Sequence, residues 1–193
     1  MQNKTLFSRH YLETRLPDHP EWSQDPRPAF KAVRALWLKT HEHGEHWNEA
    51  QTEDEFVRPA LETLGWRYVP QPTSKHGGQV TRPDYALFLD EAARDAAYKH
   101  QGDDDAFYAH CPAIAEAKYW GRPLNQKDAS GRESWKTGNP SHQMVAYLVG
   151  THVPWGILTN GAVWRLYSRE VSSTASEFYE VDLDALFEGL PAD

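Results

Sequence analysis

Two carboxylates and one amine lie at the ends of two short apolar runs. Pro83-Asp84 opens one run, and Glu116-Ala117-Lys118 closes another. If the two runs form neighbouring strands, these charged side chains point at one place. Carboxylate oxygens are the ligands that Mg²⁺ prefers, and a lysine beside such an ion can orient or deprotonate an attacking water. The pattern therefore predicts a metal-dependent phosphodiester hydrolase.

The run at 113–119 (AIAEAKY) predicts a strand with charged residues on an otherwise apolar face. Because successive side chains of a strand point to opposite faces, Ile114, Glu116 and Lys118 share one face. Two charged groups are costly to bury without partners, and a shared cation would explain them. The alternative is a Glu116–Lys118 ion pair at a sheet edge, because so short a pattern also arises by chance in charged chains.

A second constellation lies on the helix expected at 141–150. The i, i+4 spacing of Gln143 and Tyr147 puts both on one helix face, while Met144, Val145 and Leu148 can face a core. By itself this pattern is equally typical of an ordinary amphipathic helix.

The elements that must position these residues alternate between helices and strands. We expect helices at about 28–39, 49–64, 91–98, 141–150 and 185–188. We expect extended segments at 68–69, 83–89, 113–119, 155–159, 162–167 and 178–183. Asn160-Gly161 between two apolar runs is the strongest short hairpin signal. The remaining predictions are an irregular arm over 1–27, a turn at 75–78, a solvated loop at 101–105 and a long loop at 121–140.

The helix at 49–64 has two candidate starts. Thr52 and Glu55 have capping-box spacing, and Asn48 is an equally good cap that would start the helix earlier. Pro59 lies inside this helix and should kink it or mark its first turn.

Length and composition bound the class of protein. A chain of 193 residues suits one domain with a sizeable core. No apolar run reaches the roughly 18 residues that a membrane span needs, and the polar start lacks a signal-peptide core. Cys111 is the only cysteine, which excludes an internal disulfide. We expect a cytoplasmic protein in a reducing setting, with no membrane partner.

The net charge of −8 argues at first against a nucleic-acid partner, which usually meets a basic patch. The acids are concentrated, however: the stretch 170–193 holds seven acidic residues and no basic one. The stretch 118–136 is locally basic, and its candidate phosphate contacts are Arg122, Lys127, Arg132 and Lys136. A basic loop without any such role is the equal alternative.

The order Pro83-Asp84, Glu116-x-Lys118 and Gln143-x-x-x-Tyr147 resembles the PD-(D/E)xK nuclease superfamily, in the branch whose last helix carries Gln-x-x-x-Tyr. The stretch 49–66 (EAQTEDEFVRPALETLGW) is similar to the opening helix of the nuclease domain in type IIG-like and type I restriction–modification enzymes. The stretch 155–167 (WGILTNGAVWRLY) is similar to the hairpin that follows their catalytic core. The resemblance covers about residues 45–185.

The resemblance implies an α/β fold with a restriction-endonuclease-like core, in which helices flank a mixed central sheet. It implies that Asp84, Glu116 and the carbonyl of Ala117 hold Mg²⁺, for which Mn²⁺ can substitute. Lys118 would position the water or stabilise charge on the phosphate. Gln143 and Tyr147 would support the site and the DNA backbone.

Members of this family often add a carboxylate from the first helix. Glu49 and Glu53 share the face that runs through Phe56 and Ala60, and Glu49 matches the family's position better. An acid at a helix start that interacts only with the helix dipole is the alternative.

The expected organisation is an N-terminal arm and helix at 1–44, followed by a nuclease domain at 45–193. The interval between Asp84 and Glu116 is longer than the family's minimal hairpin, so we expect an insertion at 91–105. The implied partners are DNA, a methyltransferase or target-recognition module in the same or another chain, and a second copy for double-strand cleavage. The expected function is DNA cleavage in restriction–modification or phage defence. The alternatives are an inactive DNA-binding or assembly module and an enzyme that acts on RNA.

Three other groups carry weaker signals. The histidines around 41–46 suggest zinc, but their spacing is poor for a tetrahedral site and cysteine is absent. Trp120 and Trp135 can stack on bases, although packing is the commoner role of tryptophan. Asp103 to Asp105 are expected to lie in a solvated loop.

Overall fold

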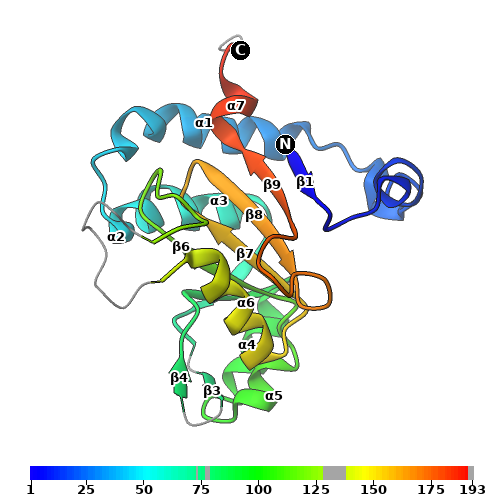
Figure 1. Ribbon diagram of the computed structural model, residues 1–193, viewed down its shortest axis with the longest axis vertical. Helices are drawn as coiled ribbons and strands as arrows, with labels where there is room; N and C mark the ends of the chain where they lie inside the picture. Colours follow the sequence, from blue (N-terminus) through cyan, green and yellow to red (C-terminus); the bar gives the residue numbers. More distant parts are fainter. Residues whose placement is uncertain (73, 77–78, 128–137, 191–193) are drawn as a thin grey trace.

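A seven-stranded mixed sheet runs through the protein in this computed structural model, which describes residues 1–72, 74–76, 79–127 and 138–190 (Figure 1). The strands are β1 (Gln2–Lys4), β2 (Arg67–Pro70), β5 (Tyr85–Phe88), β6 (Ala113–Ala117), β7 (Trp155–Thr159), β8 (Val163–Ser168) and β9 (Phe178–Asp182). They are ordered β1-β9-β8-β7-β6-β5-β2. Short strands β3 (Ser74–His76) and β4 (Gln79–Thr81) form a separate antiparallel pair. The expected α/β class with a mixed central sheet is confirmed.

Only β6 and β7 pair in parallel, and every other neighbouring pair of the sheet is antiparallel. A parallel pair needs a crossover, and α6 (Pro140–Thr151) lies in the connection between these two strands. The hairpin predicted at Asn160-Gly161 joins β7 to β8.

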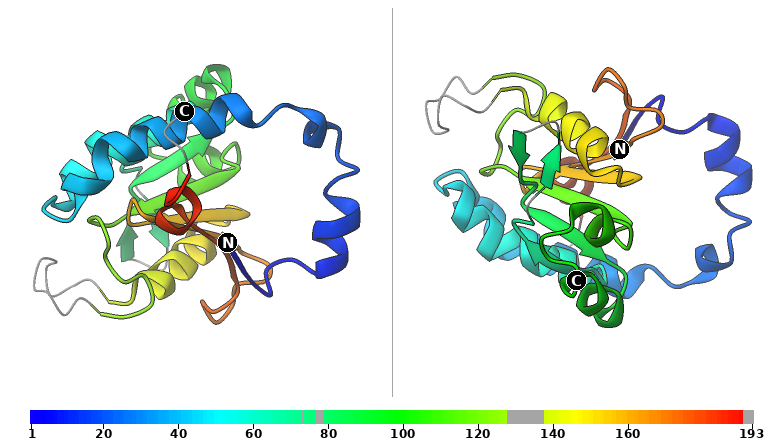
Figure 2. Two further views of the ribbon diagram at one scale, coloured as in Figure 1. Left: turned by 90° about the horizontal axis from the view of Figure 1, so that it is seen from above. Right: turned by 90° about the horizontal axis from the view of Figure 1, so that it is seen from below.

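Helices cover both faces of the sheet. Figure 2 shows α1 (Arg27–Gly44) and α3 (Arg58–Thr63) on one side and α6 on the other. The central strands β5 and β6 are buried at every position, as expected for strands covered on both faces. Alternate residues serve the two faces: Ile114 joins the cluster that includes Met144 and Leu148 of α6, whereas Ala113 and Ala115 pack with Leu61 of α3.

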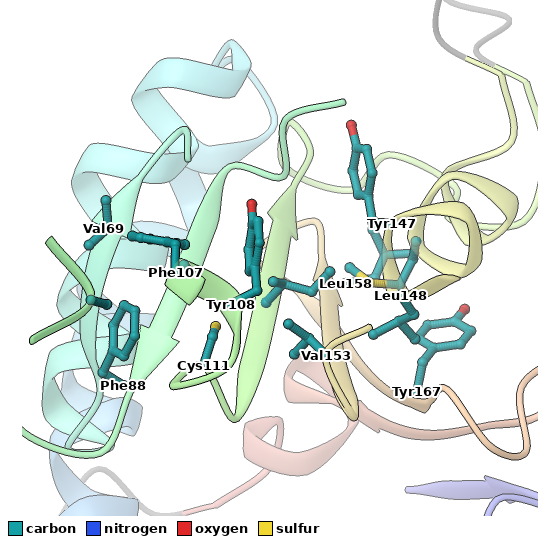
Figure 3. Packing of buried hydrophobic residues seen from close by; sticks show 14 of the residues in the cluster. Val69, Phe88, Phe107, Tyr108, Cys111, Tyr147, Leu148, Val153, Leu158 and Tyr167 are labelled. Atoms are coloured by element: carbon teal, nitrogen blue, oxygen red, sulfur yellow. The ribbon is translucent and has the colours of Figure 1, made fainter. Parts of the chain in front are cut away.

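The remaining α-helices of the described chain are α2 (Glu49–Thr52), α4 (Glu91–Tyr98), α5 (Asp104–Tyr108) and α7 (Leu183–Phe187), and short helical turns lie at Tyr11–Arg15 and Pro20–Ser23. Ala97 of α4 and Phe107 of α5 pack into the cluster under α6, which Figure 3 shows from close by. No helix in the described part of the chain is both long enough and apolar enough to cross a bilayer.

The helix predicted at 49–64 runs from Glu49 to Thr63 as α2, a π-helical turn over Glu53–Val57 and α3. Its N-cap is Asn48, whose side chain forms a capping box with Gln51, so the spacing of Thr52 and Glu55 does not mark the helix start. Pro59 sits in the first turn of α3, directly after the π-helical turn. A proline has no N–H to give the preceding turn, which explains the local change of hydrogen-bond pattern.

Three further boundaries differ from expectation. The first helix continues to Gly44 instead of ending near Lys39. The predicted arm is not wholly irregular, because β1 pairs with β9. The region at 101–105 is not all loop either: Asp103 caps α5 by accepting a hydrogen bond from the Ala106 N–H.

Residues 1–44 pack against the rest of the chain through β1 and through α1, which contacts α3 and α7. Besides the β1–β9 pairing, the indole N–H of Trp37 in α1 donates to Asp184 at 2.7 Å. The Trp37 ring also packs near Phe187 of α7, with ring centroids 5.5 Å apart.

Trp120 closes the space between the end of α1, the helix from Glu49 and the β7–β8 hairpin. It is 6 % exposed, and its ring meets Phe56 edge-on at a centroid distance of 5.1 Å. A Cβ atom added at Gly44 or at Gly161 would overlap the Trp120 ring. This tryptophan is therefore a packing residue, as the alternative to base stacking predicted.

Gly161→Ala should destabilise the protein by about 2–5 kcal/mol, the sum of backbone strain and overpacking. Gly161 has φ +82° and faces the Trp120 ring. The matched control is Gly65→Ala, since Gly65 has φ +90° but no neighbour within 4 Å of an added Cβ. Urea denaturation measures both variants, and equal losses in the two would show that Trp120 does not restrict position 161.

Candidate active site

The antiparallel register of β5 and β6 brings Asp84 beside Glu116. Tyr85 lies opposite Ala115 in this ladder. Because the strands are antiparallel, Asp84, which precedes Tyr85, lies opposite Glu116, which follows Ala115. The Asp84 N–H donates to Glu116 Oε2 at 3.3 Å, and the Ala117 N–H donates to Asp84 Oδ2 at 2.8 Å. The two carboxylates that the sequence singled out thus lie together.

Lys118 continues β6 and reaches back over the same site. Its backbone N–H donates to the carbonyl of Thr159 at 2.8 Å, which extends the pairing of β6 with β7. Its ammonium nitrogen lies 2.8 Å from Glu116 Oε1 and 3.7 Å from Glu49 Oε2. Glu116 and Lys118 are only 3 % and 2 % exposed, so their interaction is almost entirely removed from water.

Glu49, rather than Glu53, is the helix carboxylate at Lys118. The Glu53 carboxylate accepts a hydrogen bond from the Tyr85 hydroxyl and lies 3.5 Å from Arg58. Glu49 stands at the first residue of α2 and is 39 % exposed at its side chain. The preference for Glu49 that rested on family resemblance therefore agrees with where the two side chains lie.

The electrostatics of the site favour positive charge. Burial, followed by the neighbouring Glu116 carboxylate, raises the pKa of Asp84 well above its ordinary value. Burial also raises the pKa of Glu116, although Lys118 acts in the opposite direction. Burial disfavours the charged form of Lys118, but the surrounding carboxylates outweigh it and raise the pKa of this lysine.

The site residues fit a bound divalent cation of the magnesium type. When ionised, Asp84, Glu116 and Glu49 would place three negative charges around the one positive charge of Lys118, and the raised pKa values of Asp84 and Glu116 reflect how costly their charges are without a cation. In the described part of the chain, no three His, Cys, Asp or Glu side chains form a group that could hold a metal ion by themselves. Mg²⁺ does not require one, since it usually keeps several waters and takes one or two carboxylates. The carbonyl of Ala117, between Glu116 and Lys118 in the chain, is the further oxygen that would serve.

The Gln143/Tyr147 pair of α6 lies next to these charges. Gln143 Nε2 donates to the Tyr147 hydroxyl at 2.7 Å, while Gln143 Oε1 is buried with no hydrogen-bond partner among the described residues. Burial raises the pKa of Tyr147, and the carboxylates of Glu116 and Asp84 raise it further. Its ring belongs to the cluster under α6, and its hydroxyl points away from Leu148 and Leu158 (Figure 3).

Ser141 fixes the start of α6, a role that no local pattern around it indicates. Its hydroxyl donates to the carbonyl of Leu124 at 2.6 Å and accepts a hydrogen bond from Tyr167 of β8 at 2.8 Å. Ser141 is 1 % exposed. The helix that carries Gln143 is therefore attached both to the loop after β6 and to the sheet.

The predicted phosphate contacts separate into three groups. Arg122 is fully buried, and its guanidinium donates to the carbonyls of Pro123 and Gln126. It stabilises the loop after β6, so we leave it out of the proposed DNA surface. Lys127 is exposed and remains available. Arg132 and Lys136 lie outside the described residues, as does Trp135.

The histidines at 41–46 do not gather into a metal site. His41 stacks on Trp37 with ring centroids 3.9 Å apart, and its Nδ1 lies 2.9 Å from the Trp37 carbonyl oxygen. His43 and His46 are exposed at the end of α1 and just beyond it.

Comparisons of the chain with protein-family models, with curated proteins and with solved structures find no match. Arguments about function therefore rest on the geometry of the site itself.

Asp84→Asn should raise the melting temperature by about 2–6 °C at neutral pH in EDTA, equivalent to roughly 1–2 kcal/mol in a chain of this size. The folded pKa of Asp84 lies above its unfolded value, so the charged form lowers stability at neutral pH. That penalty begins to shrink once the pH falls below the folded pKa and is gone below the unfolded pKa. The advantage of the variant should therefore shrink in acid, as measured by circular-dichroism melts across a pH series.

The same melts should show Mg²⁺ or Mn²⁺ stabilising the wild type and not Asp84→Asn, since only a native site binds the ion. Glu170→Gln removes an exposed carboxylate and is the control. Equal stabilisation of all three proteins would place the ion elsewhere.

Proposed function

We propose that this protein is a Mg²⁺-dependent DNA endonuclease domain with a restriction-endonuclease-like core of the PD-(D/E)xK type. The observation that carries the proposal is the meeting of Asp84, Glu116 and Lys118 at the adjoining ends of β5 and β6. Glu49 and the Gln143/Tyr147 pair approach the same place from two helices.

The order of elements supports a core of this type. The helix from Glu49 is followed by β2, β5 and β6, then by α6 and the parallel strand β7. This order agrees with the helix, mixed sheet and helix that the resemblance implies. The stretch between β5 and β6 holds α4 and α5, in the place where an insertion was expected.

In the proposed reaction, Asp84, Glu116 and the carbonyl of Ala117 hold Mg²⁺, and Mn²⁺ can replace it. A bound Mg²⁺ supplies Lewis-acid polarisation of the phosphate and a more acidic water. The protein's own contribution is to hold oxygen ligands rigidly in a mostly buried place, because both carboxylates are fixed by backbone N–H donors from the opposite strand.

Lys118 acts as a cation in this proposal. Its raised pKa keeps the amine protonated at neutral pH, so it donates hydrogen bonds to the attacking water or to a phosphate oxygen. It does not begin as a free base. The two carboxylates beside it restrain its position.

The Gln143/Tyr147 pair and the exposed Lys127 would contact the substrate or the water around it. Gln143 Oε1 is a buried acceptor without a hydrogen-bond partner within the described structure. It could accept a hydrogen bond from a water molecule at the site. Lys127, just beyond the loop held by Arg122, would neutralise DNA phosphate. A methyltransferase or target-recognition module would choose the sequence, and a second copy would allow both strands to be cut. Restriction or phage defence in the cytoplasm is the setting we propose.

Plasmid cleavage in Mg²⁺ tests the proposal. Asp84→Asn and Lys118→Met should each lower the rate at least about a thousandfold, as expected when several kcal/mol of transition-state charge stabilisation are lost. Lys31→Met, at an exposed site on α1, should cleave like the wild type. EDTA should stop all cleavage, and Mn²⁺ should restore it.

Equal rates in the wild type and the two site variants, or cleavage that persists in EDTA, would contradict the proposal. Faster cleavage of RNA than of DNA would reassign the substrate.

An inactive DNA-binding or assembly module is the second candidate. The net charge of −8 favours it. An acidic surface repels DNA phosphate, whereas a role in assembly does not require close contact with DNA. It predicts DNA binding without cleavage and no effect of divalent ions on melting.

Lys127→Ala should weaken DNA binding at low salt under either function, because it removes one phosphate contact. The slope of log K against log salt concentration should fall by about one unit. Fluorescence anisotropy over a salt series measures this slope, with Lys31→Ala as the control. An unchanged slope would remove Lys127 from the interface.

A further inference from the structure

We propose that Thr52 is a positioning residue of this site: its hydroxyl fixes the helix that carries Glu49 against the chain segment that carries Lys118. The inference rests on the proposed function for its catalytic consequence, but its geometric content can be tested without activity.

The Thr52 hydroxyl joins two elements that are far apart in the sequence. Its Oγ1 accepts a hydrogen bond from the Trp120 backbone N–H at 3.0 Å and lies 3.0 Å from the Asn48 carbonyl, to which it donates. Thr52 has no exposed surface. A backbone N–H left buried without an acceptor is costly, so this bond favours one placement of the helix.

The Thr52–Trp120 bond and the Glu49–Lys118 ion pair form two parallel links. Glu49 precedes Thr52 by three residues in the helix, so the two side chains lie on neighbouring parts of one face. Lys118 precedes Trp120 by two residues. Both links therefore join the same two segments of the chain. The Thr52–Trp120 hydrogen bond holds together the backbones that carry Glu49 and Lys118, whose charged groups lie 3.7 Å apart.

Trp120 provides the rigid end of this arrangement. Its ring is held among Gly44, Gly161 and Phe56, with no room for a Cβ at either glycine. The backbone N–H of Trp120 therefore has a defined position, and the helix must adjust to it.

The ion pair alone would not fix Glu49. Its side chain is 39 % exposed, and partly exposed ion pairs contribute little to stability and constrain long side chains poorly. A fully buried hydroxyl with one donor and one acceptor partner is a more rigid constraint. The partners of the Thr52 hydroxyl are the Asn48 carbonyl and the Trp120 N–H rather than Asp84, Glu116 or Lys118, so its proposed effect acts through Glu49.

The chain offers a matched control in Thr40. It is also a buried helical threonine, 2 % exposed, but its hydroxyl donates only within α1, to the Leu36 carbonyl at 2.8 Å. Replacing either threonine with valine keeps the shape and removes one hydroxyl. Only the change at Thr52 breaks a link between elements.

The experiment compares Thr52→Val, Thr52→Ser and Thr40→Val in plasmid cleavage at saturating Mg²⁺. Thr52→Val should lower kcat about tenfold, with KM for DNA changed less than about threefold, as expected for the loss of one positioning hydrogen bond. Thr52→Ser and Thr40→Val should stay within about twofold of the wild type. Melting curves in parallel show that each variant is folded.

A double-mutant cycle separates positioning from general structural damage. In a Glu49→Gln background, Thr52→Val should lower kcat by less than about twofold, since the group it positions is already altered. A full tenfold loss in that background would overturn the inference.

Crystal structures of the wild type, Thr52→Ser and Thr52→Val decide the geometric claim even if the protein cleaves nothing. We expect Glu49 to remain next to Lys118 in the first two and to leave it in the third. If Glu49 stays within 4 Å of Lys118 in Thr52→Val, the inference is wrong. If no protein cleaves DNA but Glu49 moves as expected, the proposed function fails and the positioning role stands.

Discussion

The register between β5 and β6 determines how Asp84 lies relative to Glu116 and Lys118. A slip of one residue would turn each side chain of a strand to the other face, separating Asp84 from the Glu116 and Lys118 pair. Burial on both faces of these strands prevents such a slip. The apolar pattern that builds the core therefore also sets the distances between the charges, and the position of a reactive group here follows from packing.

That arrangement keeps more negative than positive charge in a mostly buried place. A folded protein usually avoids unbalanced buried carboxylates, and sites that violate such rules tend to be functional. Support comes from both sides of the sheet: α2 brings Glu49, and α6 brings Gln143 and Tyr147. Each helix is fixed by a buried hydroxyl, Thr52 in one and Ser141 in the other, so two small neutral residues control where large polar ones stand.

Strongly periodic elements were predictable from sequence, and so was the grouping of Asp84, Glu116 and Lys118, because strand alternation and antiparallel neighbours are enough to place them. The burial of Arg122 was not predictable, since its partners are backbone carbonyls that any residue could supply. The same holds for Trp120, whose place depends on two glycines remote in sequence. The capping of α5 by Asp103 was not predicted, because a run of acidic residues is also typical of a solvent-exposed loop. Local patterns thus reveal which residues are unusual, while contacts between distant segments decide what they touch.

The pairing of β1 with β9 has a consequence for handling the protein. Gln2–Lys4 pair with Phe178–Glu180 of β9 (Figure 1), so β1 is the edge strand at this end of the sheet and β2 is the edge strand at the other. An exposed strand edge is a template for intermolecular pairing and aggregation. The first few residues therefore protect solubility as well as completing the sheet, and a purification tag is better attached at the other end of the chain.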